Sequence, residues 1–192
     1  MVRFEDGSVM RLYRQTVEDF GLYSGMELSC EDMQKLQEAA GAMSAKMRAV
    51  RIVAATSVSK RDLEQRLIRK GEDPQQAKNA VSWMEELNLV DDLATAEQIV
   101  RRCINKGYGL SRAKQALFEK RIPKEYWEQA LQDYPDQHQN IVDFLRSRLD
   151  GDWDEKDLKR AIDALIRRGH SYGHIRKALE LLSFDTEDFR EE

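Results

Sequence analysis

The sequence predicts an all-α protein made of tandem three-helix repeats, with a small β hairpin or sheet at its start. Three observations predict this class. The chain has only 3 prolines and 10 glycines in 192 residues, and 34% of its residues are charged, which favours exposed helices. Apolar residues recur at helical spacing behind recognisable helix starts, and the apolar pattern repeats after about fifty residues. We expect the repeats to stack into an elongated, curved array.

Residues 1–29 are predicted to form the N-terminal β element. The segment from Val2 to Leu12 alternates around Asp6-Gly7, and an Asp-Gly pair is typical of a tight hairpin. A third short strand is expected from Leu22 to Leu28. Ser29 and Asp32 have the spacing of a capping box, so a helix should begin there.

Residues 30–92 are predicted to hold a long helix and the first three-helix repeat. Seven apolar positions form one stripe of the long helix: Met33, Leu36, Ala40, Met43, Met47, Val50 and Ala54. The next helices should begin at Ser59, which can cap through Asp62, and at Asp73, which is followed by a proline at the first helical position.

Residues 93–134 and 135–182 are predicted to be the second and third repeats, followed by an acidic tail at 183–192. Their leading helices should run from Leu93 to Lys106 and from Gln137 to Leu149. Pro123, Asp154 and Ser171 mark later helix starts. We expect Cys103 to pack inside, and both cysteines, Cys103 and Cys30, to be reduced.

The repeat is visible when the sequence is shifted by 50 and then by 48 residues. In the first helix of each pair, this shift aligns Leu67, Leu117 and Leu165. Near the end of the same helix it also aligns three basic residues, Lys70, Lys120 and Arg168. In the next helix it aligns Ala80, Ala130 and Ala178. One such unit buries too little apolar surface to be stable alone, so neighbouring units should stack. A stack of repeats has an extended surface, which suits an extended macromolecular partner.

No pattern in the chain predicts an enzyme, a cofactor site or a metal site. The acidic segment that begins at Asp150 resembles a calcium loop, but Glu155 and Ala161 replace its glycine and its bidentate glutamate, so a helix cap is the better interpretation. The histidines His138, His170 and His174 have no suitable third ligand, and we expect them to face solvent or to take part in the Ser171 cap. Without a signal peptide or a membrane span, we expect a cytoplasmic monomer.

Three segments resemble the RecX family of bacterial regulators. The segment from Ser59 to Gly71 looks like the family's first-repeat helix, the segment from Leu87 to Asp92 like its Asp-Asp junction, and the segment from Gly107 to Ile122 like its central segment. The chain departs from the family at Arg121, where glycine is common, and at Thr95, where an aromatic residue is common.

The resemblance implies a regulator, most often an inhibitor, of the RecA recombinase. Members of this family lie in the groove of the RecA filament on single-stranded DNA. They alter its ATPase activity, extension and strand exchange in homologous recombination, DNA repair and the SOS response, and they bind DNA weakly themselves. The expected partners are therefore the RecA filament and single-stranded DNA, and possible contact with duplex DNA is left open.

A dense basic run in the second repeat is the candidate site for contact with the filament or with DNA phosphates. Its members are Arg101, Arg102, Lys106, Arg112, Lys114, Lys120 and Arg121, and we add Arg66, Arg69 and Lys70 of the first repeat. A solvated helix face is an equally simple interpretation. Two other functions stay open at this stage, a helix-turn-helix regulator that binds DNA and a helical scaffold for another protein.

Overall fold

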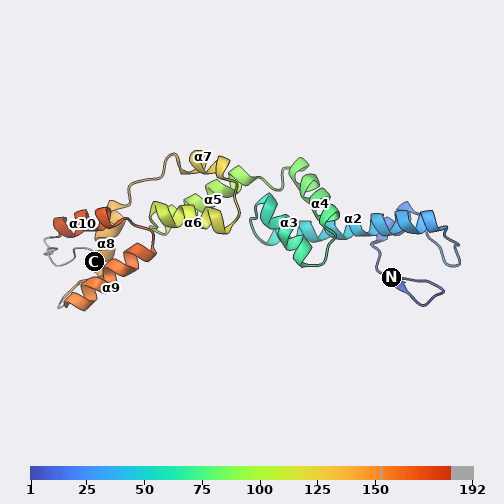
Figure 1. Ribbon diagram of the computed structural model, residues 1–192, viewed down its shortest axis with the longest axis horizontal. Helices are drawn as coiled ribbons and strands as arrows, with labels where there is room; N and C mark the ends of the chain where they lie inside the picture. Colours follow the sequence, from blue (N-terminus) through green and yellow to red (C-terminus); the bar gives the residue numbers. More distant parts are fainter. Residues whose placement is uncertain (152, 183–192) are drawn as a thin grey trace. The chain divides into compact units, whose positions relative to one another are not determined.

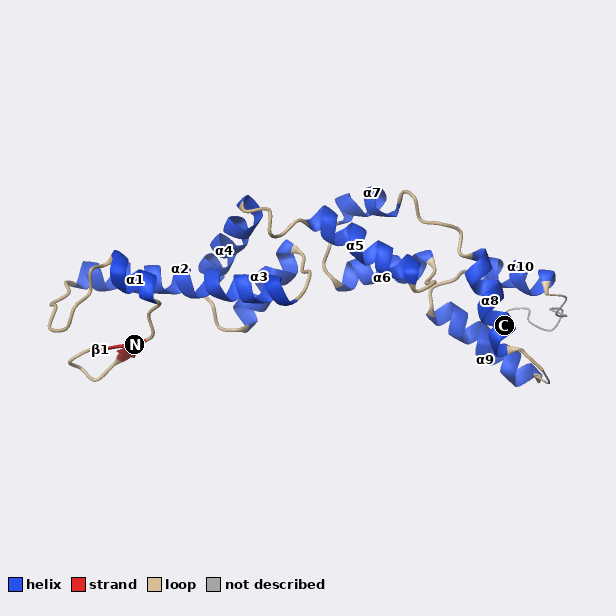
Figure 2. Cartoon of the chain, turned by 180° about the vertical axis from the view of Figure 1, so that it is seen from behind, coloured by secondary structure: helices blue, strands red, loops and turns tan. Residues whose placement is uncertain are grey.

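Helices dominate the chain, as the sequence predicts (Figures 1 and 2). The computed structural model describes residues 1–151 and 153–182, and the chain divides into two compact units between Asp91 and Asp92. In the described part the only sheet has two strands, so the predicted helical class with a small β element is confirmed. No helix there is long and apolar enough to cross a membrane. The predicted acidic tail at 183–192 lies outside the described residues.

A short antiparallel hairpin opens the first unit. β1 (Val2–Arg3) pairs with β2 (Val9–Met10), and the Asp6 carboxylate accepts a hydrogen bond from the Ser8 amide at 2.8 Å in the turn between them. The predicted third strand at 22–28 is wrong. A turn in which the Met26 amide donates to the Tyr23 carbonyl at 3.2 Å bends the chain in the middle of that segment.

A helix that the sequence analysis did not predict, α1 (Arg14–Asp19), lies between the hairpin and this loop. It packs on the first half of α2 (Cys30–Ala55), where Thr16 and Leu36 are buried. The Ser29 hydroxyl accepts a hydrogen bond from the Asp32 amide at 3.1 Å, so α2 begins where the capping pattern predicted.

The second half of α2 packs against α3 (Lys60–Arg69) and α4 (Pro74–Glu86). Their shared core is made of eleven buried residues: Ala45, Ala49, Ile52, Val58, Leu63, Leu67, Ala77, Ala80, Val81, Met84 and Val90. A buried carboxylate links the turn between α3 and α4 to α2, because Glu72 accepts from the partly exposed Arg48 at 2.7 Å and from Ser44 at 3.0 Å. The predicted caps at Ser59 and Asp73 both form.

The second unit begins with a bundle of α5 (Asp92–Asn105), α6 (Leu110–Glu119), the 3₁₀ helix η1 (Lys124–Tyr126) and α7 (Trp127–Leu131). Ala96, Val100, Leu117 and Ile122 form its buried core. Trp127 packs on this core, and its indole donates to the Ile122 carbonyl at 3.0 Å.

The same unit continues with α8 (His138–Arg148), α9 (Glu155–Arg167) and α10 (Tyr172–Leu181), which share a core of their own. Asp154 caps α9 through the amide of Asp157, which is 2.8 Å away, and the two residues form a complete capping box. Ser171 caps α10 through the His174 amide, as the sequence predicted.

The two bundles of the second unit touch backbone to backbone where α6 begins and α9 ends. The Gly109 amide donates to the Arg168 carbonyl at 2.9 Å, and a Cβ atom placed on Gly109 would lie 2.0 Å from the Gly169 carbonyl oxygen. His170 is buried here, only 6% exposed, with its Nε2 3.0 Å from the Gly107 carbonyl oxygen. The expectation that His170 faces solvent is therefore wrong, because the close contact between the bundles covers it.

Six helices in the described part of the chain end in one way, with a left-handed residue two positions after the last helical residue. These positions are Gly21, Gly71, Asn88, Gly107, Arg121 and Gly169. The amide of the left-handed residue and the amide of the residue after it donate to carbonyls of the last turn, which satisfies groups that a helix end would otherwise leave unpaired. Arg121 reaches φ +57 without being glycine. The departure from the family pattern at Arg121 thus keeps the geometry of the turn and adds backbone strain.

Candidate functional site

Helix α5 has one buried face and one basic face. Ala96, Val100 and Cys103 lie on the buried face, at spacings of four and three residues. On the outward face Gln98, Arg101, Arg102 and Asn105 follow the same periodicity, and Lys106 comes directly after the helix. The sequence therefore places two guanidinium groups on one exposed surface, with no acidic residue between positions 98 and 106.

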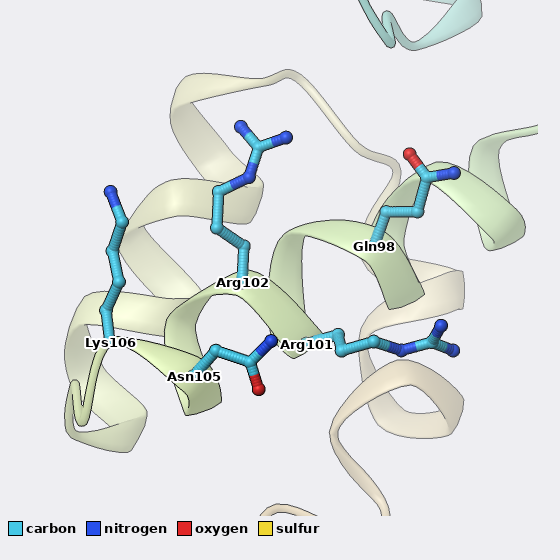
Figure 3. Close-up of a pocket in the computed structure, with 5 residues that line it drawn as sticks. All are labelled: Gln98, Arg101, Arg102, Asn105 and Lys106. Atoms are coloured by element: carbon cyan, nitrogen blue, oxygen red, sulfur yellow. The ribbon is translucent and has the colours of Figure 1, made fainter.

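These five residues line a shallow, open hollow of about 340 Å³, which we call the α5 basic face. Figure 3 shows the five side chains projecting from the ribbon, with Arg102 and Lys106 extending in the same direction. Arg101 and Arg102 are exposed, and neither forms an ion pair with any residue in the described part of the chain. Their charges are therefore available to a partner.

Two groups close to the basic face, the buried Cys103 and the partly buried Tyr134, are uncharged. Burial raises the pKa of the Cys103 thiol, although the nearby Arg112, Lys106 and Arg102 act against that shift. The hydroxyl of Tyr134 donates to the Tyr108 carbonyl at 2.7 Å, and burial raises the pKa of this tyrosine to about 12. Both groups stay protonated and uncharged near neutral pH, so they do not neutralise the cations above them.

The α5 basic face is suited to binding anions. A guanidinium group offers paired N–H donors that match a carboxylate or a phosphate, and the side-chain amides of Gln98 and Asn105 add further donors at the edges. Among the described residues no group of three or more histidine, cysteine or acidic side chains could hold a metal ion. The surface is open and shallow, which fits a macromolecular partner better than a small molecule.

The other predicted residues of the second unit are divided between different roles. Arg112 is partly buried, and its guanidinium binds the Glu119 carboxylate at 3.0 Å, so its charge is already neutralised within the chain. Lys114 is exposed on α6. Lys120 caps α6, and Arg121 is the left-handed residue after it, so both help to end that helix. Lys106 also lies over the Tyr108 ring, 5.9 Å from its centre.

Arg66, Arg69 and Lys70 belong to the first unit. Arg66 binds Asp62 at 2.9 Å, which neutralises it locally. Arg69 is exposed, with its Nε donating to the Gln65 carbonyl at 3.3 Å, and Lys70 is exposed at the end of α3. These three residues gather at the end of one helix and stay a separate prediction from the α5 basic face.

Comparisons with known proteins identify the family. A family model described as RecX, second three-helix domain, matches residues 91–131, which hold α5, α6, η1 and α7. Regulatory protein RecX of Stenotrophomonas maltophilia (strain R551-3) is 30% identical over 135 residues, covering 68% of this chain and 82% of that protein. The chain belongs to the RecX family.

Other RecX proteins agree in sequence and in fold. Regulatory protein RecX of Vibrio parahaemolyticus serotype O3:K6 is 29% identical over 152 residues, covering 76% of this chain and 94% of that protein. A crystal structure of regulatory protein RecX has a TM-score of 0.67 at 17% identity, covering 93% of this chain and 91% of that one. The structure of RecX from Lactobacillus salivarius has a TM-score of 0.62 at 21% identity, covering 75% and 97%.

Sequence reasoning missed two residues of the α5 basic face, Gln98 and Asn105. The predicted site was defined by positive charge, which includes lysine and arginine and leaves out the uncharged amides. Their positions, three residues before and four residues after Arg101, were a sufficient signal that they share its helix face. In this member of the RecX family the candidate surface is therefore a mixed stripe of cations and amides.

Proposed function

We propose that this RecX protein regulates the RecA recombinase by binding the filament that RecA forms on single-stranded DNA. It acts as an inhibitor that lies in the filament groove and reduces ATP hydrolysis, filament extension and strand exchange during recombination, DNA repair and the SOS response. It works in the cytoplasm, as a monomer and without a cofactor. The α5 basic face is the contact surface.

The single observation that carries the residue assignment is the unpaired state of Arg101 and Arg102. Exposed arginines on a helical protein are commonly paired with nearby acids, as Arg176 is with Glu180 at 3.0 Å and Arg160 is with Asp157 at 3.0 Å. The exposed Glu97 lies one helical turn before Arg101, yet neither Arg101 nor Arg102 forms an ion pair in the described part of the chain, so both cations remain able to attract an anionic surface.

A filament of protein on DNA supplies two kinds of anion, acidic side chains and phosphates. Contacts of exposed arginines with either kind weaken as salt rises, since the Debye length falls to about 8 Å at physiological ionic strength. The chain as a whole carries a formal charge of −4, so it does not attract DNA through its overall field. We therefore expect weak binding to free single-stranded DNA and much tighter binding to the filament.

The experiment is a titration of the protein into RecA, single-stranded DNA and ATP. ATP hydrolysis and filament length are followed together. We expect both to fall as the protein is added at micromolar concentration. No change in either would refute the proposal, and tight binding to duplex DNA without RecA would favour a DNA-binding regulator in its place.

Two double variants test the surface. Arg101→Ala with Arg102→Ala removes the unpaired cations, and we expect it to abolish inhibition while the helical circular dichroism spectrum stays unchanged. Lys156→Ala with Lys159→Ala is the matched control, because it removes the same charge from two exposed residues of α9. Equal loss of inhibition in both variants would show a general charge effect and would reject the α5 basic face as the contact.

A further inference from the structure

Two bundles of the second unit expose a large apolar side chain at the same position of the same helix. Phe118 in the last turn of α6 is 70% exposed, and Ile166 in the last turn of α9 is 48% exposed. Each directly follows a leucine, Leu117 or Leu165, that is completely buried in its own bundle. The two exposed residues are 48 residues apart, which is the spacing of the repeat.

The local backbone is the same around both side chains. The carbonyl of Phe118 accepts from the amide of Arg121 at 2.9 Å, and the carbonyl of Ile166 accepts from the amide of Gly169 at 2.8 Å. Both acceptor residues therefore stand three positions before a left-handed residue that ends the helix. With the preceding leucine pointing into the core in each case, Phe118 and Ile166 leave their bundles in equivalent directions.

Isolated exposed apolar residues are common on protein surfaces and need no explanation. Repetition distinguishes this pair from the others in the unit. The exposed Leu110 corresponds to the buried Leu158, and the exposed Leu181 corresponds to Asp133, an acidic residue. Phe118 and Ile166 are thus the large apolar side chains that both bundles present at one repeat position.

The charged neighbours of the two residues are not repeated. The exposed Lys114, one helical turn before Phe118, corresponds to the buried Ile162, and the exposed Arg167 beside Ile166 corresponds to Glu119 beside Phe118. The feature that the two positions share is therefore the exposed apolar side chain, without a common charge beside it.

The chemistry favours a protein over a nucleic acid. Stacking on a base requires a flat π surface, which Phe118 has and Ile166 lacks. The property that the two side chains share is apolar volume, which fills a pocket in a protein. A partner that offers the same pocket twice at regular spacing is a polymer of identical protein subunits.

We propose that Phe118 and Ile166 dock into equivalent apolar pockets on two subunits of a homopolymeric protein filament. The inference rests on the proposed function, which makes RecA that filament, and it adds a second contact to the one through the α5 basic face. Two equivalent contacts held on one chain reinforce each other, because binding of the first raises the effective concentration of the second.

The test measures affinity for RecA filaments assembled on a single-stranded oligonucleotide, and affinity for the oligonucleotide alone. Phe118→Ala and Ile166→Ala are compared with Leu181→Ala, which removes an equally exposed apolar side chain that has no apolar counterpart. We expect each of the first two to weaken filament binding about tenfold and the double variant to weaken it further, as loss of a buried apolar anchor does. Leu181→Ala should bind like wild type, and oligonucleotide binding should not change.

The outcomes separate this inference from the proposed function. If the wild-type chain does not bind filaments, the proposed function fails and this inference fails with it. If the wild-type chain binds and both alanine variants bind equally well, only the docking of Phe118 and Ile166 is overturned. If Phe118→Ala loses oligonucleotide binding while Ile166→Ala retains all binding, Phe118 stacks on bases and the inference is also overturned.

Discussion

The contact between Gly109 and Gly169 leads to a quantitative prediction for Gly109→Ala. Gly109 has φ −76 and ψ 164, which alanine adopts freely, so the substitution introduces no backbone strain of its own. The added methyl would lie 2.0 Å from the carbonyl oxygen of Gly169 and 2.3 Å from its carbonyl carbon. These are backbone atoms, so the clash is relieved only when the two bundles of the second unit move apart.

The cost has two parts. Separation breaks the hydrogen bond from the Gly109 amide to the Arg168 carbonyl, now 2.9 Å long, which is worth about 1 kcal/mol. Strain or lost packing around an inserted methyl adds about 1–3 kcal/mol. We therefore expect Gly109→Ala to lower the free energy of unfolding by about 2–4 kcal/mol.

Urea unfolding followed by circular dichroism measures the change, and hydrogen exchange of peptides around residues 107–113 and 165–172 locates it. Gly173→Ala is the control, because a Cβ atom at Gly173 meets no atom within 4 Å. It should raise stability by about 0.5 kcal/mol, since alanine is the better helix former. If Gly109→Ala unfolds at the wild-type urea concentration and exchanges no faster in these peptides, the close contact between the bundles does not exist in solution.

Three further predictions concern side chains in special environments. Arg121→Gly should raise the free energy of unfolding by about 1 kcal/mol, because glycine adopts φ +57 without the steric clash of an arginine Cβ. Thermal unfolding measures the change, and a variant that melts at or below the wild-type temperature would contradict the prediction. Burial lowers the pKa of His170 below 6.5, so the unfolded chain binds a proton first. Stability should therefore fall as the pH drops below 6.5 towards the folded-state pKa. The variant His170→Gln keeps a donor for the Gly107 carbonyl but has no titratable side chain. Its urea midpoint should therefore depend less on pH than the midpoint of wild type. An equal pH dependence would rule out His170 as the cause. Glu72→Ala should lower the free energy of unfolding by about 2 kcal/mol, because it removes a buried carboxylate that binds Arg48, and an unchanged urea midpoint would show that the pair contributes nothing.

The parts of the fold that could be predicted are those encoded locally. Three helix starts depend on a side chain that caps the amide three residues later: Ser29, Ser59 and Asp154. Four consecutive residues are therefore enough to predict where such a helix begins. The buried stripe of α5 follows from spacing alone, and the exposed position of Arg101 and Arg102 follows with it.

The parts that could not be predicted depend on contacts between distant segments. His170 is covered because α6 begins against the end of α9, and its partner Gly107 is 63 residues away in the chain. Nothing near His170 in the sequence signals that contact. Arg112 was expected to face a partner, yet it binds Glu119 seven residues later, a spacing at which helical periodicity does not by itself predict an ion pair. Helix α1 is short and depends on packing against α2, so its own sequence pattern was too weak.

The unequal exposure of the two cysteines has a practical consequence. Cys30 is exposed in the first turn of α2, whereas Cys103 is buried and its pKa is raised, so its reactive thiolate is scarce. A maleimide dye would therefore label the natural sequence at one chosen point, without mutagenesis. Fluorescence from that point would report in real time how fast the chain joins and leaves its target.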